Sequence, residues 1–243
     1  MGFYHINNLY KDQEILEFRT CYALEKIHGT SANVHWKDGQ VLFSSGGERH
    51  DRFKSLFDEE ALILKFAERF LPTDAVYVYG EAYGGKCQGM SKTYGIDLKF
   101  AAFDVKVNDS WLSVPNAVEF VEFLGLEFVD YKLIETTMET INFERDRPST
   151  QASRNGIVDS DKIREGVVLR PPFECTLNNG RRIIAKHKRE EFAERGRPDV
   201  ELDPSKREML ENAGAIALEW VTCFRVGNSY EARTCHRHVD FFS

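Results

Sequence analysis

The first third of the chain alternates between short apolar runs and polar turns. Residues 21–26 form one strand-like run, and residues 32–36 and 41–43 form two more that flank Asp38-Gly39. An Asp-Gly pair between alternating runs is a strong signal for a tight hairpin, because both residues tolerate the positive φ angles that such a turn requires. The pattern therefore predicts a strand, a short break and then a β-hairpin.

Apolar residues at helical spacing come next, and the pattern then returns to strands. Residues 58–70 combine that spacing with an acidic first turn, which predicts a helix with one face in the core. Residues 75–79 predict a strand that ends at Glu81, with a glycine-containing loop directly after it. A second strand, over residues 98–107, carries Asp104 in its middle, where a buried carboxylate is costly without a partner.

The second half of the chain mixes both periodicities. It predicts helices over residues 113–123 and 134–141, and strands over residues 164–170 and 181–189. Residues 146–159 are polar and predict a long loop or an inserted flap.

Composition and charge mainly exclude classes of protein. A chain of 243 residues with 42% hydrophobic residues can form one substantial core, and a net charge of -7 argues against coating nucleic acid through overall charge. The first residues lack the regions of a signal peptide, and no apolar run reaches membrane length. We therefore expect a soluble monomer with no membrane partner, either cytoplasmic or a viral protein in a host cytoplasm.

The five cysteines predict neither a disulfide framework nor a zinc site. They are an odd number, they are scattered, and no two of them form a Cys-x-x-Cys pair. The group Cys223, Cys235, His236 and His238 fits no standard zinc-finger spacing. We expect reduced, structural thiols.

Residues 25–30, Glu-Lys-Ile-His-Gly-Thr, hold the best candidate for covalent chemistry. Lys26 lies between a predicted strand and a glycine turn, and a lysine amine in such a place can act as a nucleophile. Free lysine has a pKa of about 10.4, so Lys26 needs desolvation or neighbouring cations to lose its proton at neutral pH. Alternation along the last predicted strand puts Lys186 and Lys188 on one face, and two adjacent cations need an anion.

In their order along the chain, these segments resemble the motifs of the covalent nucleotidyltransferase superfamily, which contains RNA ligases, DNA ligases and RNA capping enzymes. Residues 25–30 resemble the first motif of phage-type, nick-sealing RNA ligases and RNA-editing ligases, with His28 where DNA ligases and capping enzymes usually have Asp. The later motifs are matched by Tyr79-Gly80-Glu81, Phe103-Asp104-Val105, residues 165–170 and Lys186-His187-Lys188. The resemblance covers roughly residues 20–195.

The resemblance implies a fold, a domain organisation and a reaction. The expected fold is α+β, a nucleotidyltransferase (ATP-grasp-like) domain of antiparallel sheets with flanking helices. It would occupy residues 1–197, and residues 198–243 would form a short helical extension, either a minimal tail or a truncated RNA-binding domain. The implied activity is that of an ATP-dependent RNA ligase, which transfers AMP from ATP to a lysine, then to an RNA 5′-phosphate, and finally joins that end to a 3′-hydroxyl.

Roles for single residues follow from the same resemblance. Lys26 would form the lysyl-AMP, Phe103 would stack on adenine, and Glu81 would bind the ribose. Glu165 would hold Mg²⁺ or Mn²⁺, and the main chain around Lys26 would contact the adenine edge. The implied nucleotide-binding residues are Glu25, Ile27, Ser31, Glu81, Phe103, Glu165, Lys186 and Lys188, and the implied partners are ATP and RNA ends or a nicked duplex.

The chain departs from the family pattern at two places. Ser31 stands where phage-type relatives usually have Asn, and Ser45-Gly46-Gly47 stands where an arginine usually follows the hairpin. Arg49 or Arg52, in the loop that follows, is a candidate replacement for that arginine.

Two other functions remain as alternatives. The first is a DNA ligase or a capping-type nucleotidyltransferase, against which His28 and the lack of an evident second domain argue. The second is an inactive module that binds nucleotides or RNA ends, against which the presence of every charged member of the motif set argues.

Overall fold

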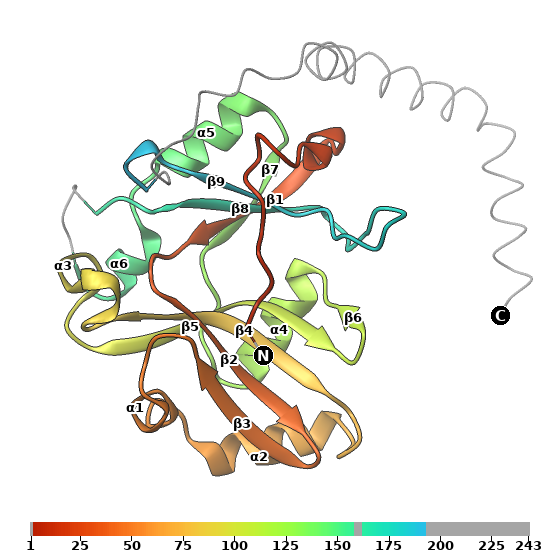
Figure 1. Ribbon diagram of the computed structural model, residues 1–243, viewed down its shortest axis with the longest axis vertical. Coiled ribbons are helices and arrows are strands. Elements are labelled where there is room, and N and C mark those ends of the chain that lie inside the picture. Colours follow the sequence, from red (N-terminus) through yellow and green to blue (C-terminus); the bar gives the residue numbers. More distant parts are fainter. Residues whose placement is uncertain (1, 158–161, 193–243) are drawn as a thin grey trace, which may run out of the picture. The chain divides into compact units, whose positions relative to one another are not determined.

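Two antiparallel sheets form the framework of the protein in the computed structural model, which describes residues 2–157 and 162–192 (Figure 1). All of these residues belong to one compact unit of the chain. The predicted extension over residues 198–243 lies outside the described residues. No helix in the described ranges is both long and apolar enough to cross a bilayer.

The larger sheet has the strand order β3-β2-β4-β5-β6. Asp38 and Gly39 form the turn between its first two strands with φ angles of 52° and 73°, so the predicted hairpin is confirmed. The ring of Trp36 stacks on that of Phe66 in helix α2, which joins the helix to the sheet in one apolar core. The strands are β2 (Thr30–Lys37), β3 (Gln40–Ser45), β4 (Val76–Gly84), β5 (Leu98–Val107) and β6 (Ser110–Trp111), and the longer helices that share this core are α2 (Glu59–Arg69) and α4 (Val114–Phe123).

The smaller sheet has the strand order β7-β1-β8-β9. Its central strand β1 (Thr20–Lys26) pairs with β7 (Tyr131–Glu135) on one side and with β8 (Gly166–Arg170) on the other. Strand β9 (Ala185–Lys188) pairs with the outer edge of β8, and helix α5 (Met138–Asp146) packs against this sheet. The sheet therefore brings Lys26, which ends β1, next to segments more than 130 residues later in the chain.

The N-terminal segment extends the smaller sheet by one short bridge. Asn8 pairs with Lys186 in parallel, through hydrogen bonds from Leu9 N to Lys186 O (2.8 Å) and from Lys186 N to Asn7 O (2.9 Å). The 3₁₀ helix η1 (Glu14–Glu17) follows this segment.

The predicted loop after Glu81 is wrong, because β4 continues to Gly84. Residues of this strand pair on both sides, with β2 through Ala82 and with β5 through Ala82 and Gly84. Glycines in this stretch suggested a loop, but Gly80 is required by packing, since a Cβ there would lie 2.4 Å from Ala101 O. Glu81 therefore lies inside a strand that has neighbours on both edges.

Two predictions in the second half are also wrong in part. Ile134 belongs to β7, and helix α5 begins only after Thr137, whose side chain accepts a hydrogen bond from Thr140 N at 3.2 Å. The predicted loop over residues 146–159 contains the short helix α6 (Thr150–Arg154), and the predicted strand over residues 181–189 is reduced to β9. The remaining short helices are α1 (His50–Lys54), η2 (Cys87–Gly89), α3 (Ser91–Tyr94) and η3 (Glu190–Phe192).

Candidate active site

A cavity of about 350 Å³ lies against both sheets. Strand β1 contributes Lys26, strand β4 contributes Glu81, and β5 contributes Phe103 to its lining. The sequence-predicted residues that line the cavity are Glu25, Lys26, Ile27, Ser31, Glu81, Phe103 and Lys186. Glu165 and Lys188 are not among its lining residues, but both lie at the Lys26 end through the contacts described next.

One carboxylate holds the charged groups around Lys26. Glu165 Oε2 lies 3.0 Å from Lys26 Nζ and 3.2 Å from His28 Nδ1, and Glu165 Oε1 lies 2.7 Å from Lys188 Nζ. Burial by itself would raise the pKa of Glu165, but the hydrogen bond with His28 and the charges of Lys26 and Lys188 lower it to about 2. Glu165 is thus the anion for Lys188, one of the two lysines of β9, as well as for Lys26.

Glu81 connects β4 to the turn that follows Lys26. Its Oε1 accepts a hydrogen bond from Gly29 N at 3.1 Å. Gly29 has no room for a side chain, because a Cβ there would lie 2.3 Å from Ala82 O. Burial raises the pKa of Glu81 to about 7, although the nearby charge of Lys26 opposes the shift. The two carboxylic acids at this end of the cavity therefore have pKa values displaced in opposite directions.

The raised pKa of Glu81 predicts that the free energy of unfolding depends on pH. A carboxyl that binds its proton more tightly when folded adds stability at low pH, and this term falls as the pH rises from about 4.5 to about 7. In Glu81→Gln this term is absent, so the variant should gain up to about 3 kcal/mol relative to the parent protein across that window. Urea unfolding at several pH values measures the difference, with the exposed Glu119→Gln as the control. A difference that stays constant from pH 5 to pH 8 would contradict the assignment.

Aromatic rings form part of the cavity wall. Phe103 lies on the cavity wall, and the ring of Phe3 meets it edge-on with centroids 4.9 Å apart. Phe3 also contacts the rings of Tyr79 and Trp111, at 5.1 and 5.7 Å. Sequence reasoning missed this N-terminal contribution, because Phe3 and its neighbour Tyr4 show no periodicity, and only their aromatic character was available as a signal.

Asp104 has the partners that its burial required. Arg170 Nη1 lies 2.9 Å from Asp104 Oδ1, and Arg182 Nη1 lies 2.7 Å from Asp104 Oδ2. Both arginines also pair with Glu174, which is less deeply buried. The expectation that Asp104 is paired is therefore confirmed, although the sequence did not identify these two arginines as its partners.

The two departures from the family pattern meet at the hairpin. Ser31 lines the cavity, and its Oγ is buried without a hydrogen-bond partner among the described residues. Gly46 N donates a hydrogen bond to Ser31 O at 2.9 Å, and this bond holds the Ser45-Gly46-Gly47 loop against the start of β2. Neither candidate replacement for the missing arginine lines the cavity, and Arg52 pairs with Glu48 at 3.3 Å.

Within the described ranges, no group of three or more His, Cys, Asp or Glu residues is arranged to hold a metal ion. Cys21, Cys87 and Cys175 are free thiols, as expected. The group Cys223, Cys235, His236 and His238 lies outside the described residues.

The model of the RNA ligase family matches residues 19–188, and the chain therefore belongs to this family. Solved structures give the same result for the fold. A Naegleria gruberi RNA ligase mutant with AMP and Mn matches with a TM-score of 0.60 and 16% sequence identity, over 79% of this chain and 57% of that chain. A mutant of the same ligase with ATP and Mn gives 0.59 and 17%, over 79% and 57%, and an apo mutant gives 0.57 and 18%, over 77% and 55%.

These findings confirm the predicted fold class, two antiparallel sheets with flanking helices, and the resemblance on which it was based. The chain covers a little more than half the length of the Naegleria protein. The comparison with curated protein sequences gives no match.

Proposed function

We propose that this chain is an ATP-dependent RNA ligase that forms a lysyl-AMP intermediate on Lys26. The observation that carries the proposal is the placement of the Lys26 amine beside a cavity, within 3.0 Å of Glu165, in a chain of the RNA ligase family. The similar Naegleria structures with AMP and Mn or ATP and Mn support the same choice of nucleotide and ion.

In the first step, Lys26 Nζ forms a bond to the α-phosphorus of ATP, and the bond from that phosphorus to the departing pyrophosphate breaks. The ammonium of Lys26 must first lose a proton. Glu165 has a pKa of about 2, so it orients the amine rather than storing the proton, which passes to solvent. Lys186 and Lys188, on strand β9, stabilise the charge that develops on the phosphate.

The remaining cavity residues suit the nucleoside part of ATP. Phe103 offers an aromatic ring for adenine, and Glu81, also on the cavity wall, can bind a ribose hydroxyl. Ser31 Oγ adds a hydroxyl that has no protein partner in the described ranges. Glu25 and Ile27 also line the cavity, and we propose that their main chain contacts the adenine edge. A volume of about 350 Å³ is within the range for small-molecule sites.

The residues at the Lys26 end can hold a divalent ion only together with substrate phosphates and water. Among the described residues at the Lys26 end, Glu165 is a carboxylate that is ionised well below neutral pH, and it is already paired with lysines. Mg²⁺ typically binds through one or two carboxylates together with substrate phosphates and water, which matches this donor set. When bound, Mg²⁺ or Mn²⁺ would neutralise charge on the phosphates.

AMP would then pass to an RNA 5′-phosphate, and a 3′-hydroxyl would displace it and close the phosphodiester bond. RNA ends or a nicked duplex are the proposed partners. A DNA-joining or capping enzyme, and a module that only binds nucleotides or RNA ends, are the alternatives.

Incubation with α-labelled ATP or GTP and Mg²⁺, followed by denaturing electrophoresis, separates these possibilities. We expect a covalent label from ATP, located on the Lys26 peptide by mass spectrometry, and its transfer to a 5′-phosphorylated RNA. A label from GTP alone would indicate capping chemistry, transfer to DNA alone would indicate a DNA ligase, and the absence of label would leave the binding module.

A further inference from the structure

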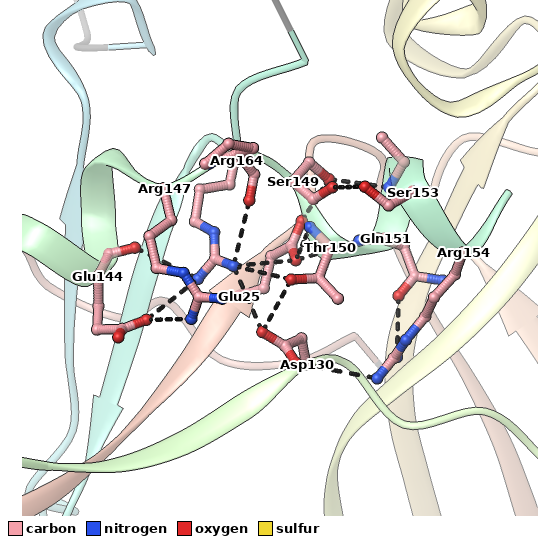
Figure 2. Close-up of polar contacts among 12 residues, drawn as sticks. Glu25, Asp130, Glu144, Arg147, Ser149, Thr150, Gln151, Ser153, Arg154 and Arg164 are labelled. Carbon is pink, nitrogen blue, oxygen red and sulfur yellow. Dashed lines mark hydrogen bonds and ion pairs between the residues drawn. The ribbon is translucent and has the colours of Figure 1, made fainter. Parts of the chain in front are cut away.

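The side chain of Glu25 lies in a buried polar network. Ser149 Oγ donates to Glu25 Oε1 at 2.5 Å, and the backbone amides of Thr150 and Gln151 donate to Glu25 Oε2 at 2.9 and 3.3 Å. Arg164 Nη2 lies 3.5 Å from the same oxygen, and the side chains of this ion pair are 0% and 1% exposed. Figure 2 shows the Glu25 carboxylate enclosed by these groups.

Arg164 extends the network to three further segments of the chain. Its Nη2 lies 3.4 Å from Asp130 Oδ2, 3.2 Å from Thr150 Oγ1 and 3.4 Å from Pro148 O, and its Nη1 donates to Glu144 O at 3.3 Å. The guanidinium is therefore held by the end of α5, by the connection to α6 and by the residue before β7 (Figure 2). A planar group with so many fixed partners has one available position.

Both residues of the buried ion pair, Glu25 and Arg164, are next in sequence to residues of the candidate active site. Glu25 directly precedes Lys26, and Arg164 directly precedes Glu165. Successive residues of an extended chain point to opposite faces, so one ion pair lies behind the sheet and the Lys26–Glu165 pair lies in front. The β1–β8 register, with Lys26 opposite Gly166, connects the two pairs through only a few backbone atoms.

We propose that Glu25 and Arg164 are positioning residues that set the separation of Lys26 and Glu165 for attack on ATP. Their ion pair holds the end of β1 against the start of β8. The distance between Lys26 and Glu165, on the other face of the sheet, depends on how these two segments are held. The resemblance implied that Glu25 contacts the nucleotide through its main chain. In this proposal the carboxylate of Glu25 acts from the opposite face of the sheet. The activity readout of this inference rests on the proposed ligase function.

The inference predicts a selective defect. Only the first step makes a bond to Lys26, so misplacing its amine should slow formation of the lysyl-AMP more than later joining. A displacement of about 1 Å can cost about 100-fold in rate. Glu25→Gln keeps the length of the side chain but has one acceptor oxygen in place of two and no charge. Arg164→Lys keeps the charge but loses the planar guanidinium with its several donors.

The first experiment measures two rates for each variant at a temperature well below its Tm. We expect lysyl-AMP formation at saturating ATP to fall by about 10- to 100-fold, with KM for ATP changed by less than about threefold. Joining of a pre-adenylylated RNA strand without ATP should change by less than about threefold. Phe66→Leu, which removes core packing from helix α2, is the matched control for a loss of stability, and it should leave both rates unchanged. Parallel losses in both rates of Glu25→Gln, or rates within about twofold of the parent, would overturn the inference.

The second experiment needs no activity. An amine-reactive acylating reagent modifies lysines in the absence of nucleotide, and peptide mass spectrometry reports the rate at each position. We expect the rate at Lys26 to change at least about threefold in both variants, while Lys37 at the exposed hairpin is unchanged. An unchanged rate at Lys26 would overturn the positioning role even if the parent protein forms lysyl-AMP. Conversely, a parent protein that forms none would refute the proposed function, and the Lys26 labelling would still decide this inference.

Discussion

Lys26→Arg should form no detectable lysyl-AMP, a loss of at least about 10³-fold, because the guanidinium keeps its proton and cannot act as a nucleophile. The substitution preserves the positive charge beside Glu165, 3.0 Å away in the parent protein, so the fold and ATP binding should remain. Transfer of label from α-labelled ATP measures the first quantity, and equilibrium binding of ATP measures the second.

Lys37→Arg is the matched control, since Lys37 is exposed at the end of β2 and outside the cavity. It should label like the parent protein. Labelling of Lys26→Arg above about one thousandth of that of the parent protein would show that another residue accepts AMP. It would contradict the proposed role of Lys26.

Asp104→Ala should lower the free energy of unfolding by about 3–5 kcal/mol, the largest stability effect we expect for a single substitution. Asp104 and its partners Arg170 and Arg182 are all buried, so removing the carboxylate leaves two guanidinium groups facing each other without the anion between them. Urea unfolding at neutral pH measures the change.

Asp109→Ala provides the comparison, because Asp109 is fully exposed and its 3.7 Å pair with Lys106 lies at the surface. Its effect should stay within about 0.5 kcal/mol. A loss below about 1 kcal/mol for Asp104→Ala would mean that Glu174 alone compensates both arginines.

The sequence predicted an element correctly where the residues of that element alone carry the pattern. The hairpin at Asp38-Gly39 and the helix after Asp58 follow from turn chemistry and from a capped apolar stripe, and the structure confirms both. The charged companions of Lys26 were predicted from motif order, and the structure brings Glu165 and Lys188 to it. Their roles in catalysis remain predictions.

The parts that sequence reasoning missed depend on distant partners. Ser149 reaches Glu25 across 124 positions of the chain, and neither residue has a local pattern that reveals the other. Helix α6 is five residues long and mostly polar, so it has no apolar stripe to detect. The continuation of β4 beyond Glu81 is stabilised by pairing on both edges, which outweighs the preference of its glycines for loops.

The shared carboxylate at the Lys26 end has an electrostatic consequence for encounter with substrate. Lys26 and Lys188 share one carboxylate, Glu165, and the nearby Glu81 has a pKa of about 7, which leaves it partly protonated at neutral pH. Among these four groups positive charge exceeds negative charge at neutral pH, within a chain of net charge -7. Polyanions are attracted to the cavity and repelled by much of the remaining surface, so ionic strength acts on both the rate and the direction of their approach.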